Sequence, residues 1–421
     1  MSIDISNHPC FNDKIRHTYG RVHLPVASRC NVQCNFCNRK YDCVNESRPG
    51  VTSAVLSPYQ ALHYLEHVME KKSNISVVGI AGPGDPFANA EETMQTLRLV
   101  REKYPDMILC VATNGLDIEP YIDEIAALDV SHVTITINAV EPETGARIYS
   151  WVRHKKKVYN PEQGAKILLE NQLNAVKALK EKGVTIKINS IIIPGINDDH
   201  IPAVAGKVSE LGVDILNCVP YYRNKGAAFE DIEEPSPQVI QRVRKEAGKY
   251  VLQMHHCTRC RADAVGLLGE ETDKELMGKL MECGDMPLRP ADDRPYIAVA
   301  SREGVLVNQH LGEAEQLLIF GKKDNGIKLI EARKTPDRGS GTERWEKLSE
   351  SLKDCCTLLV SGIGENPRQV LGKRGINVLV LEGLIEEAVT AVFTGKNISH
   401  LMKRERTVCG DDCSGTGGGC S

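Results

Sequence analysis

Short apolar runs rich in β-branched residues alternate with longer amphipathic stretches between residues 20 and 250. The apolar runs predict strands at 21–27, 75–81, 107–113, 132–138, 184–192 and 213–219. The amphipathic stretches predict helices, of which the clearest are 58–71, 88–104 and 161–183. Because such alternation is typical of βα units around a parallel sheet, we expect an α/β fold with a (β/α) barrel of TIM type.

A second, smaller α/β unit is predicted beyond residues 285–295, where three prolines interrupt a polar run and leave little to pack. We interpret 285–295 as a linker between a barrel domain at 1–284 and a smaller domain at 296–400. Within the smaller domain, apolar runs surround a helix-like stretch at 342–355. The remaining residues, 401–421, are rich in glycine and predict a flexible tail.

Composition and charge exclude several classes of partner. The 421 residues carry a net charge of −4 and include 26% charged residues, so no basic excess points to a nucleic acid. The first residues lack the pattern of a secretion signal, and no apolar run reaches the roughly 18 residues that cross a membrane. We therefore expect a cytoplasmic protein with no membrane partner. Its 15 cysteines favour metal ligation over disulfides in a reducing compartment.

Three cysteines with a spacing of three and then two residues follow the first predicted strand, at Cys30, Cys34 and Cys37. Three thiolates can hold a four-iron cluster and leave one iron open to a small molecule. A zinc site with a distant fourth ligand and a disulfide are the alternatives. With Phe36 before the last cysteine, the run resembles the cluster motif of the radical S-adenosylmethionine (SAM) enzymes. That resemblance implies a 4Fe-4S cluster whose open iron binds SAM.

Glycine and polar residues follow other predicted strands. The segment GPGDP at 82–86 permits a close approach of the backbone, and in radical SAM enzymes such a segment binds the amino group of SAM. An ordinary β-turn is the alternative. The candidate SAM-binding residues are Gly82, Gly84, Asp85, Thr113, Asn114 and Asn138.

More cysteines are present than one SAM cluster needs. Cys257 and Cys260 form a CxxC pair, and Cys43 lies six residues after Cys37. Cys110 is in the third predicted strand, where burial as a small apolar residue is the alternative, and Cys10 is near the start. With one histidine, these five cysteines would ligate about two further iron-sulfur clusters.

Seven segments of the chain resemble the NifB family, radical SAM maturases that build the iron-sulfur-carbide core of the nitrogenase cofactor. They are 8–11, 19–50, 79–89, 113–115, 136–152, 187–198 and 260–270. The region 296–400 resembles the NifX-like, ribonuclease-H-like modules that bind precursors of this cofactor. The resemblance therefore implies a radical SAM barrel followed by a ribonuclease-H-like domain.

The resemblance also implies the reaction. Two 4Fe-4S clusters are fused into an 8Fe-9S-C precursor, one SAM donates a methyl group, and a second SAM yields the radical that leads to the carbide. The implied partners are an iron-sulfur cluster donor, other nitrogenase cofactor assembly proteins and a reductase or ferredoxin. A radical SAM enzyme with an organic substrate and auxiliary clusters, or an iron-sulfur scaffold or carrier, remains the alternative.

The ligands of the two substrate clusters follow from the same resemblance. We group Cys10, His23 and Cys260 around one cluster and Cys43, Cys110 and Cys257 around the other. His8 and His17 are the other candidates for the histidine ligand, and a strand histidine bound to a carbonyl is the alternative for His23. Cys218, Cys283, Cys355 and Cys356 are expected to be packing residues.

Three weaker candidates remain. Glu46 is assigned to proton transfer near the clusters, with a solvated loop glutamate as the alternative. His310 could offer an imidazole to a cluster, and a helix cap at the surface is the alternative. The tail cysteines Cys409, Cys413 and Cys420 are suited to capture or delivery of a cluster, unless their spacing is a coincidence.

Overall fold

A computed structural model of the chain describes residues 5–45, 50–257, 260–270, 274–286, 294–323, 326–337, 341–396, 398 and 400–402. It divides into two compact units, Met1–Gly284 and Asp285–Ser421. Most of the predicted linker and nearly all of the predicted tail lie outside the described residues.

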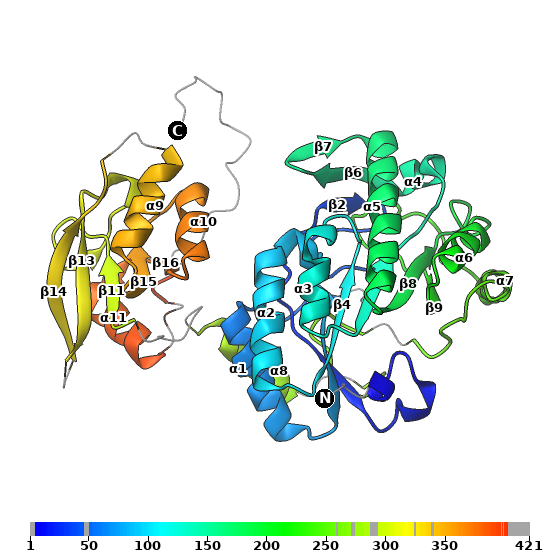
Figure 1. Cartoon of the computed structure of the whole chain (residues 1–421), viewed down its shortest axis with the longest axis horizontal. Coiled ribbons are helices and arrows are strands. Elements are labelled where there is room, and N and C mark those ends of the chain that lie inside the picture. The colour runs from blue at the N-terminus through cyan, green and yellow to red at the C-terminus, as the bar shows by residue number, and fades with distance from the viewer. Residues whose placement is uncertain are drawn as a thin grey trace. The chain divides into compact units, whose positions relative to one another are not determined.

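The first unit is built on a seven-stranded sheet with the order β10-β1-β3-β4-β5-β8-β9. Figure 1 labels three of these strands, β4, β8 and β9. Its strands are β1 (Gly20–His23), β3 (Ile75–Ile80), β4 (Ile108–Thr113), β5 (His132–Thr136), β8 (Thr185–Ile192), β9 (Ile215–Pro220) and β10 (Val265–Gly266). All neighbouring pairs are parallel except β1 with β10. The six predicted strands are confirmed, although the first ends at His23.

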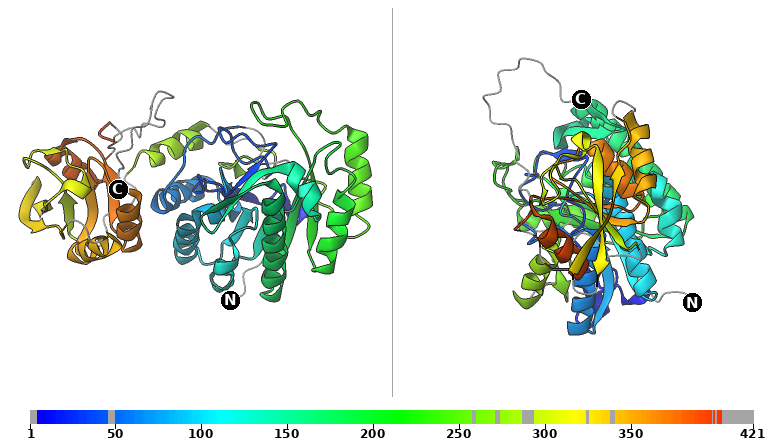
Figure 2. Two further views of the ribbon diagram at one scale, coloured as in Figure 1. Left: turned by 90° about the horizontal axis from the view of Figure 1, so that it is seen from above. Right: turned by 90° about the vertical axis from the view of Figure 1, so that its left-hand side faces the viewer.

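Helices cover the outer side of this curled sheet (Figures 1 and 2). They are α1 (Pro58–Lys71), α2 (Ala90–Lys103), α3 (Ile122–Ala127), α4 (Pro142–Ile148), α5 (Pro161–Glu181), α6 (Ile201–Glu210), α7 (Pro237–Ala247) and α8 (Lys274–Gly284). Short 3-10 turns occur at Ile5–Asn7, Asp13–Ile15, Pro86–Asn89 and Glu119–Tyr121. The three predicted helices are confirmed. Helix α1 begins at its predicted residue because Ser57 and Gln60 form a capping box.

The predicted barrel is confirmed as a partial barrel. Within the described residues the sheet has two edges, β10 and β9, and six strands run parallel, whereas a closed TIM barrel needs eight. Curling directs the carboxyl ends of the parallel strands toward one side. The loops that follow β3 and β4 are therefore neighbours although 28 residues separate Asp85 from Thr113.

A small antiparallel sheet that the sequence pattern did not predict holds the cysteine loop. It contains β2 (Val32–Cys34), β6 (Tyr149–His154) and β7 (Lys157–Tyr159), in the order β2-β6-β7. Its residues pack in one cluster with Phe36 and Leu168, and Phe36 is fully buried. The loop is thus fixed by the hydrophobic core as well as by its strand.

The second unit has a five-stranded sheet with the order β14-β13-β11-β15-β16. Its elements are β11 (Tyr296–Val299), β12 (Leu306–Val307), the 3-10 turn Leu311–Glu313, β13 (Gln316–Lys323), β14 (Gly326–Lys334), α9 (Gly341–Ser351), β15 (Cys355–Val360), α10 (Glu365–Lys373), β16 (Asn377–Val380), β17 (Gly383–Leu384) and α11 (Ile385–Thr394). Residues of α11 pack on one face of the sheet, and residues of α9 and α10 pack on the other (Figure 2, right). The predicted second α/β unit is confirmed.

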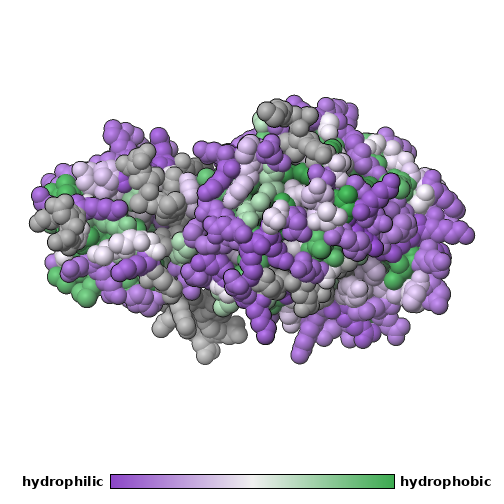
Figure 3. Space-filling view, turned by 90° about the horizontal axis from the view of Figure 1, so that it is seen from below, coloured by the Kyte–Doolittle hydropathy of each residue, from purple (hydrophilic) through white to green (hydrophobic). Residues whose placement is uncertain are grey.

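Hydrophilic residues predominate on the face shown in Figure 3, and apolar residues form only small patches there. Across the described part of the chain, every helix is too short or too polar to cross a bilayer. Cys218, Cys283, Cys355 and Cys356 are buried, as expected of packing residues.

Candidate functional site

The predicted cysteine triplet lines a single pocket. Cys30, Cys34 and Cys37 lie there together with Cys43, and Cys34 and Cys37 are buried. Strand β2 carries Cys34, and the backbone N–H of Cys37 donates to the carbonyl of Cys34 at 3.0 Å, which forms a tight turn. The structure therefore brings together the three predicted ligands of the SAM cluster and adds a fourth thiol beside them.

The electrostatics of this pocket suit an anionic cluster. Burial, reinforced by Asp85, raises the pKa of Cys30 to about 12. Burial also raises the pKa of Cys34 well above its usual range. Iron that binds here must displace thiol protons, and the charge of Arg39 acts on Cys30, Cys37 and Cys43 to offset the resulting negative charge. Three soft thiolates beside a cation fit the donor set of a four-iron cluster.

Asp85 connects the loops that follow β3 and β4. Its carboxylate accepts from the Thr113 hydroxyl at 2.9 Å, from the Asn114 backbone N–H at 2.6 Å and from the Phe87 backbone N–H at 2.9 Å. It is 4% exposed, and burial raises its pKa. These hydrogen bonds join the loops after β3 and β4, so Asp85 stabilises the wall of the triplet pocket that the two loops form.

Gly84 packs directly against the cysteine loop. A Cβ at this position would lie 2.1 Å from the carbonyl oxygen of Arg29, so only glycine fits. Its backbone N–H donates to the Ala27 carbonyl at 2.5 Å. The GPGDP segment thus packs against, and hydrogen-bonds, the backbone at the start of the loop that carries the three cysteines.

The other predicted SAM contacts fall into two groups. Gly84, Asp85, Thr113 and Asn114 line the triplet pocket, and the side-chain amide of Asn114 lies 3.9 Å from Cys30 Sγ. Gly82 and Asn138 are not among the lining residues. Asn138 is fully buried, and its side-chain oxygen accepts from the backbone N–H of Ile191 at 2.8 Å. Thr136 also lines the pocket, and its position near the end of a predicted strand was the signal that could have found it.

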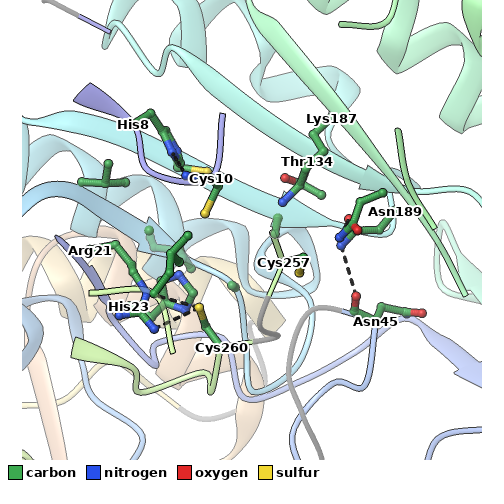
Figure 4. A pocket seen from close by; sticks show the side chains of 18 of the residues that line it. His8, Cys10, Arg21, His23, Asn45, Thr134, Lys187, Asn189, Cys257 and Cys260 are labelled. Carbon is green, nitrogen blue, oxygen red and sulfur yellow. Dashed lines mark hydrogen bonds between the residues drawn. The ribbon is translucent and has the colours of Figure 1, made fainter. Parts of the chain in front are cut away.

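A second pocket collects most of the other predicted ligands (Figure 4). Cys10, His23, Cys110, Cys257 and Cys260 line it together. They come from the N-terminal segment, from β1, from β4 and from the segment that precedes β10, so 250 residues of chain converge on one site. Burial raises the pKa of Cys10 to about 12, and Cys260, Cys110 and Cys257 reinforce this effect.

His23 is held in the tautomer that a metal ligand needs. Its Nδ1 lies 3.0 Å from the backbone carbonyl of Arg261, so Nδ1 carries the proton and Nε2 keeps its lone pair. Burial and Arg21 lower the pKa of His23 to about 4, which keeps the ring neutral. The carbonyl partner expected of a strand histidine is therefore present, and it leaves Nε2 available to iron.

The two other candidate histidines differ from His23. The Nδ1 of His8 accepts from the backbone N–H of Cys10 at 3.2 Å, so His8 carries its proton on Nε2. That buried Nε2 has no hydrogen-bond partner among the described residues. His8 lines the second pocket as a hydrogen-bond donor, whereas His17 is exposed and its Nε2 contacts Arg16.

Cys43, which our grouping places with Cys110 and Cys257, is nearer to the triplet. It lines the triplet pocket, not the pocket of Cys110 and Cys257, because its backbone N–H donates to the Pro83 carbonyl at 2.9 Å in the loop after β3. The two pockets adjoin, since Asn45 and Ala112 line both. Cys43 therefore lies on the side of the triplet in a continuous site.

Two buried cations of the second pocket were missed by the sequence analysis. Arg21 is 2% exposed and Lys187 is 8% exposed. The charge of Lys187 acts on Cys10 and on His8. A basic residue inside each of two predicted strands, 21–27 and 184–192, was the signal that could have found them.

The weaker candidates have mixed outcomes. Glu46 and the tail residues Cys409, Cys413 and Cys420 lie outside the described residues. His310 is exposed, and its Nδ1 accepts from the backbone N–H of Gly312 at 3.1 Å at the start of the turn Leu311–Glu313. The capping role is thus present.

Comparison with known proteins agrees with this arrangement. Residues 24–208 match the Radical SAM superfamily, and residues 294–395 match the family described as dinitrogenase iron-molybdenum cofactor. The FeMo cofactor biosynthesis protein NifB of Chlorobaculum tepidum is 58% identical, over 100% of both chains. NifB of Azotobacter vinelandii is 36% identical, over 92% of this chain and 88% of its own length. The chain therefore belongs to the NifB family, as a radical SAM enzyme of FeMo cofactor biosynthesis with a NifX-like second domain.

Proposed function

We propose that this chain fuses two 4Fe-4S clusters into an 8Fe-9S-C precursor of the nitrogenase cofactor and takes the carbide carbon from SAM. The observation that carries the proposal is the pair of adjoining pockets. One is lined by the cysteine triplet and the other by four cysteines and His23, and Asn45 and Ala112 line both. A radical made in the first pocket would thus arise beside clusters held in the second.

Cys30, Cys34 and Cys37 would hold the resident 4Fe-4S cluster, with Arg39 to offset its charge. When bound, this cluster and SAM supply the electron and the 5′-deoxyadenosyl radical that the chemistry needs. Asn114 and Thr136 line the space beside the triplet and offer an amide and a hydroxyl to SAM. Gly84 and Asp85 position this loop through backbone contacts.

The second pocket would hold the substrate clusters. Cys10, Cys110, Cys257 and Cys260 offer thiolates, and Cys43 adds one from the adjoining pocket. His23 offers a neutral imidazole, which is a weaker and more exchangeable ligand than a thiolate. Such a ligand suits a cluster that must rearrange and leave.

The reaction proposed for these pockets is the one that the family resemblance implies. One SAM would donate a methyl group to a substrate cluster and leave as S-adenosylhomocysteine. The 5′-deoxyadenosyl radical from a second SAM would remove one hydrogen atom from that methyl group and leave as 5′-deoxyadenosine, and loss of the two remaining protons, with electrons from the cluster irons, would lead to the carbide. One further sulfide completes the product. Glu46, next to the pocket residue Asn45 in sequence, is proposed to assist these proton transfers.

The second domain and the tail would serve delivery. We propose that the domain at 296–400 receives the product, with His310 and the tail cysteines Cys409, Cys413 and Cys420 as transient ligands. A cluster donor, a reductase or ferredoxin and downstream cofactor assembly proteins would complete the cycle in the cytoplasm.

Anaerobic metal analysis followed by turnover tests this function. After reconstitution we expect about 12 irons per chain, and turnover with methyl-labelled SAM should give S-adenosylhomocysteine, 5′-deoxyadenosine and label in the cluster. About four irons without methyl transfer would contradict the proposal. Formation of 5′-deoxyadenosine without labelled cluster would indicate an organic substrate, and cluster binding without SAM consumption would indicate a scaffold.

A further inference from the structure

Arg21 lies inside the second pocket although it is a strand residue of the sheet. It belongs to β1, where its backbone pairs with Gly266 of β10, and its side chain is one of the largest fully buried side chains. Figure 4 shows the guanidinium beside His23 and Cys260. A buried guanidinium is costly unless negative charge or several acceptors compensate for it.

The guanidinium uses its two edges differently. Its Nε and Nη2 donate to Cys260 Sγ at 3.2 and 3.0 Å, and dashed lines join the two residues in Figure 4. Its Nη1 donates to the backbone carbonyls of Gly266 at 2.5 Å and Leu267 at 2.9 Å. The Nη1 group therefore binds the backbone at β10, and Nε and Nη2 together donate two hydrogen bonds to Cys260, a proposed cluster ligand.

The described residues give Arg21 hydrogen-bond acceptors but no direct carboxylate partner. In the described part of the chain no carboxylate forms an ion pair with Arg21, and the carboxylate of Glu270, which feels its charge, bonds Lys72 at 2.9 Å. Lys187 places a second cation in the same pocket. An anionic iron-sulfur cluster held on thiolates would place negative charge beside the buried guanidinium of Arg21.

We propose that Arg21 is a positioning residue for the substrate clusters. It orients Cys260 and compensates the charge of the cluster that Cys260 holds, through two N–H···S hydrogen bonds. This inference rests on the proposed function, because it takes Cys260 as a cluster ligand. Hydrogen bonds to a ligand sulfur raise the reduction potential of an iron-sulfur cluster, and residues that orient metal ligands strengthen metal binding.

The test compares two substitutions at Arg21 with a matched arginine elsewhere. Arg21→Met removes the positive charge. Arg21→Lys keeps the charge but lacks the planar pair of N–H donors that Arg21 directs at Cys260. Arg101 is the control, because it also donates to backbone carbonyls, those of Leu128 at 2.9 Å and Met107 at 2.8 Å, away from either pocket. Each full-length, reconstituted protein is measured for iron content, for the rate of iron loss to a chelator and for the potentials of its clusters by EPR-monitored titration.

We expect Arg21→Met to lose substrate-cluster iron about 10- to 100-fold faster than the unaltered protein, with a lower potential for the remaining substrate cluster. For Arg21→Lys, the rate of iron loss and the potential should lie between those of Arg21→Met and those of the unaltered protein. The SAM cluster of each Arg21 variant, and all clusters of Arg101→Lys, should keep the iron content and potential of the unaltered protein. If Arg21→Met does not fold, the potential measured in Arg21→Lys decides the question.

Unchanged iron loss and potential in a folded Arg21 variant would overturn the proposal. Equal loss of the SAM cluster and the substrate clusters would also overturn it, because that result indicates a structural role alone. Failure of the underlying function has a different signature: the unaltered protein itself would then hold only about four irons.

Discussion

The imidazole Nδ1 of His23 donates its proton to the backbone carbonyl of Arg261 across a distance of 3.0 Å. The two residues are 238 positions apart in sequence, and the bond leaves Nε2 unprotonated toward the second pocket. His8, in the same pocket, is held in the opposite tautomer by the backbone N–H of Cys10. His23 therefore presents an unprotonated nitrogen, which we propose as an iron ligand, whereas the free nitrogen of His8 carries a proton.

Substitution of the two histidines should separate these roles. We expect His23→Ala to lose one substrate cluster, so that iron falls from about 12 to about 8 per chain, while the SAM cluster stays. His8→Ala should keep about 12 irons, because only a hydrogen-bond donor is lost. Iron analysis and EPR of the reconstituted proteins measure both. Iron loss in His8→Ala but not in His23→Ala would contradict the tautomer assignment.

Cys110 and Cys218 provide a second matched pair, since both lie on strands of the same sheet. Cys110 lines the second pocket, whereas Cys218 is fully buried and its thiol donates to the side chain of Gln253 at 3.2 Å. Cys110→Ser should lose substrate-cluster iron and methyl transfer. Cys218→Ser should keep both and change only the midpoint of urea unfolding. Full iron content in Cys110→Ser would remove this cysteine from the ligand set.

A methyl group at Gly84 should disrupt the triplet pocket. In Gly84→Ala the new Cβ would meet the Arg29 carbonyl at 2.1 Å, so the backbone must move, at a cost of about 1–3 kcal/mol. We expect a weaker SAM cluster signal and a lower unfolding midpoint. Gly278→Ala on α8 is the control, because nothing lies within 4 Å of its Cβ position. Identical behaviour of the two variants would mean that the contact with Arg29 is unimportant.

The ion pair of Asp263 with Arg261 predicts a pH dependence for the apo protein. Burial alone would raise the pKa of Asp263, but the hydrogen bonds from Arg261, at 2.8 Å, and from Ser53, at 3.0 Å, hold it below its usual range. A lowered pKa in the folded state means that the carboxylate stabilises the fold above its unfolded pKa of about 3.9. This contribution disappears as the pH falls through the lower folded value.

We therefore expect Asp263→Asn to lower the free energy of unfolding at pH 7 by about 1–3 kcal/mol. The difference from the unaltered protein should persist at pH 5 and shrink below about pH 3.9. Urea unfolding of the apo proteins at several pH values measures it. A stability difference between the two proteins that grows as the pH falls would contradict a lowered pKa of Asp263 in the folded state.

Much of the fold follows from local sequence. The alternation of apolar runs and amphipathic stretches is enough to predict the parallel strands and the helices α1, α2 and α5. A short continuous apolar run is typical of a strand buried on both faces, and an amphipathic stretch is typical of a helix with one buried face. The pattern did not reveal the sheet β2-β6-β7, since its strands are short and pair a loop with a segment more than 100 residues away. Nor did it show that the barrel is only partial, because closure depends on the number and curl of the strands.

The kind of chemistry could be predicted from the sequence, which contains a cysteine triplet of the spacing found in radical SAM enzymes, additional thiols and the segments that resemble the NifB family. Spacing sufficed there, because Cys30, Cys34 and Cys37 act within one loop. Which groups share a pocket depends on the tertiary structure. The fold places Cys43 beside the triplet, turns the unprotonated Nε2 of His23 away from its carbonyl partner and brings Arg21 to Cys260, 239 residues away. Such contacts depend on how the strands curl and which side chains they bury, and no local pattern encodes that.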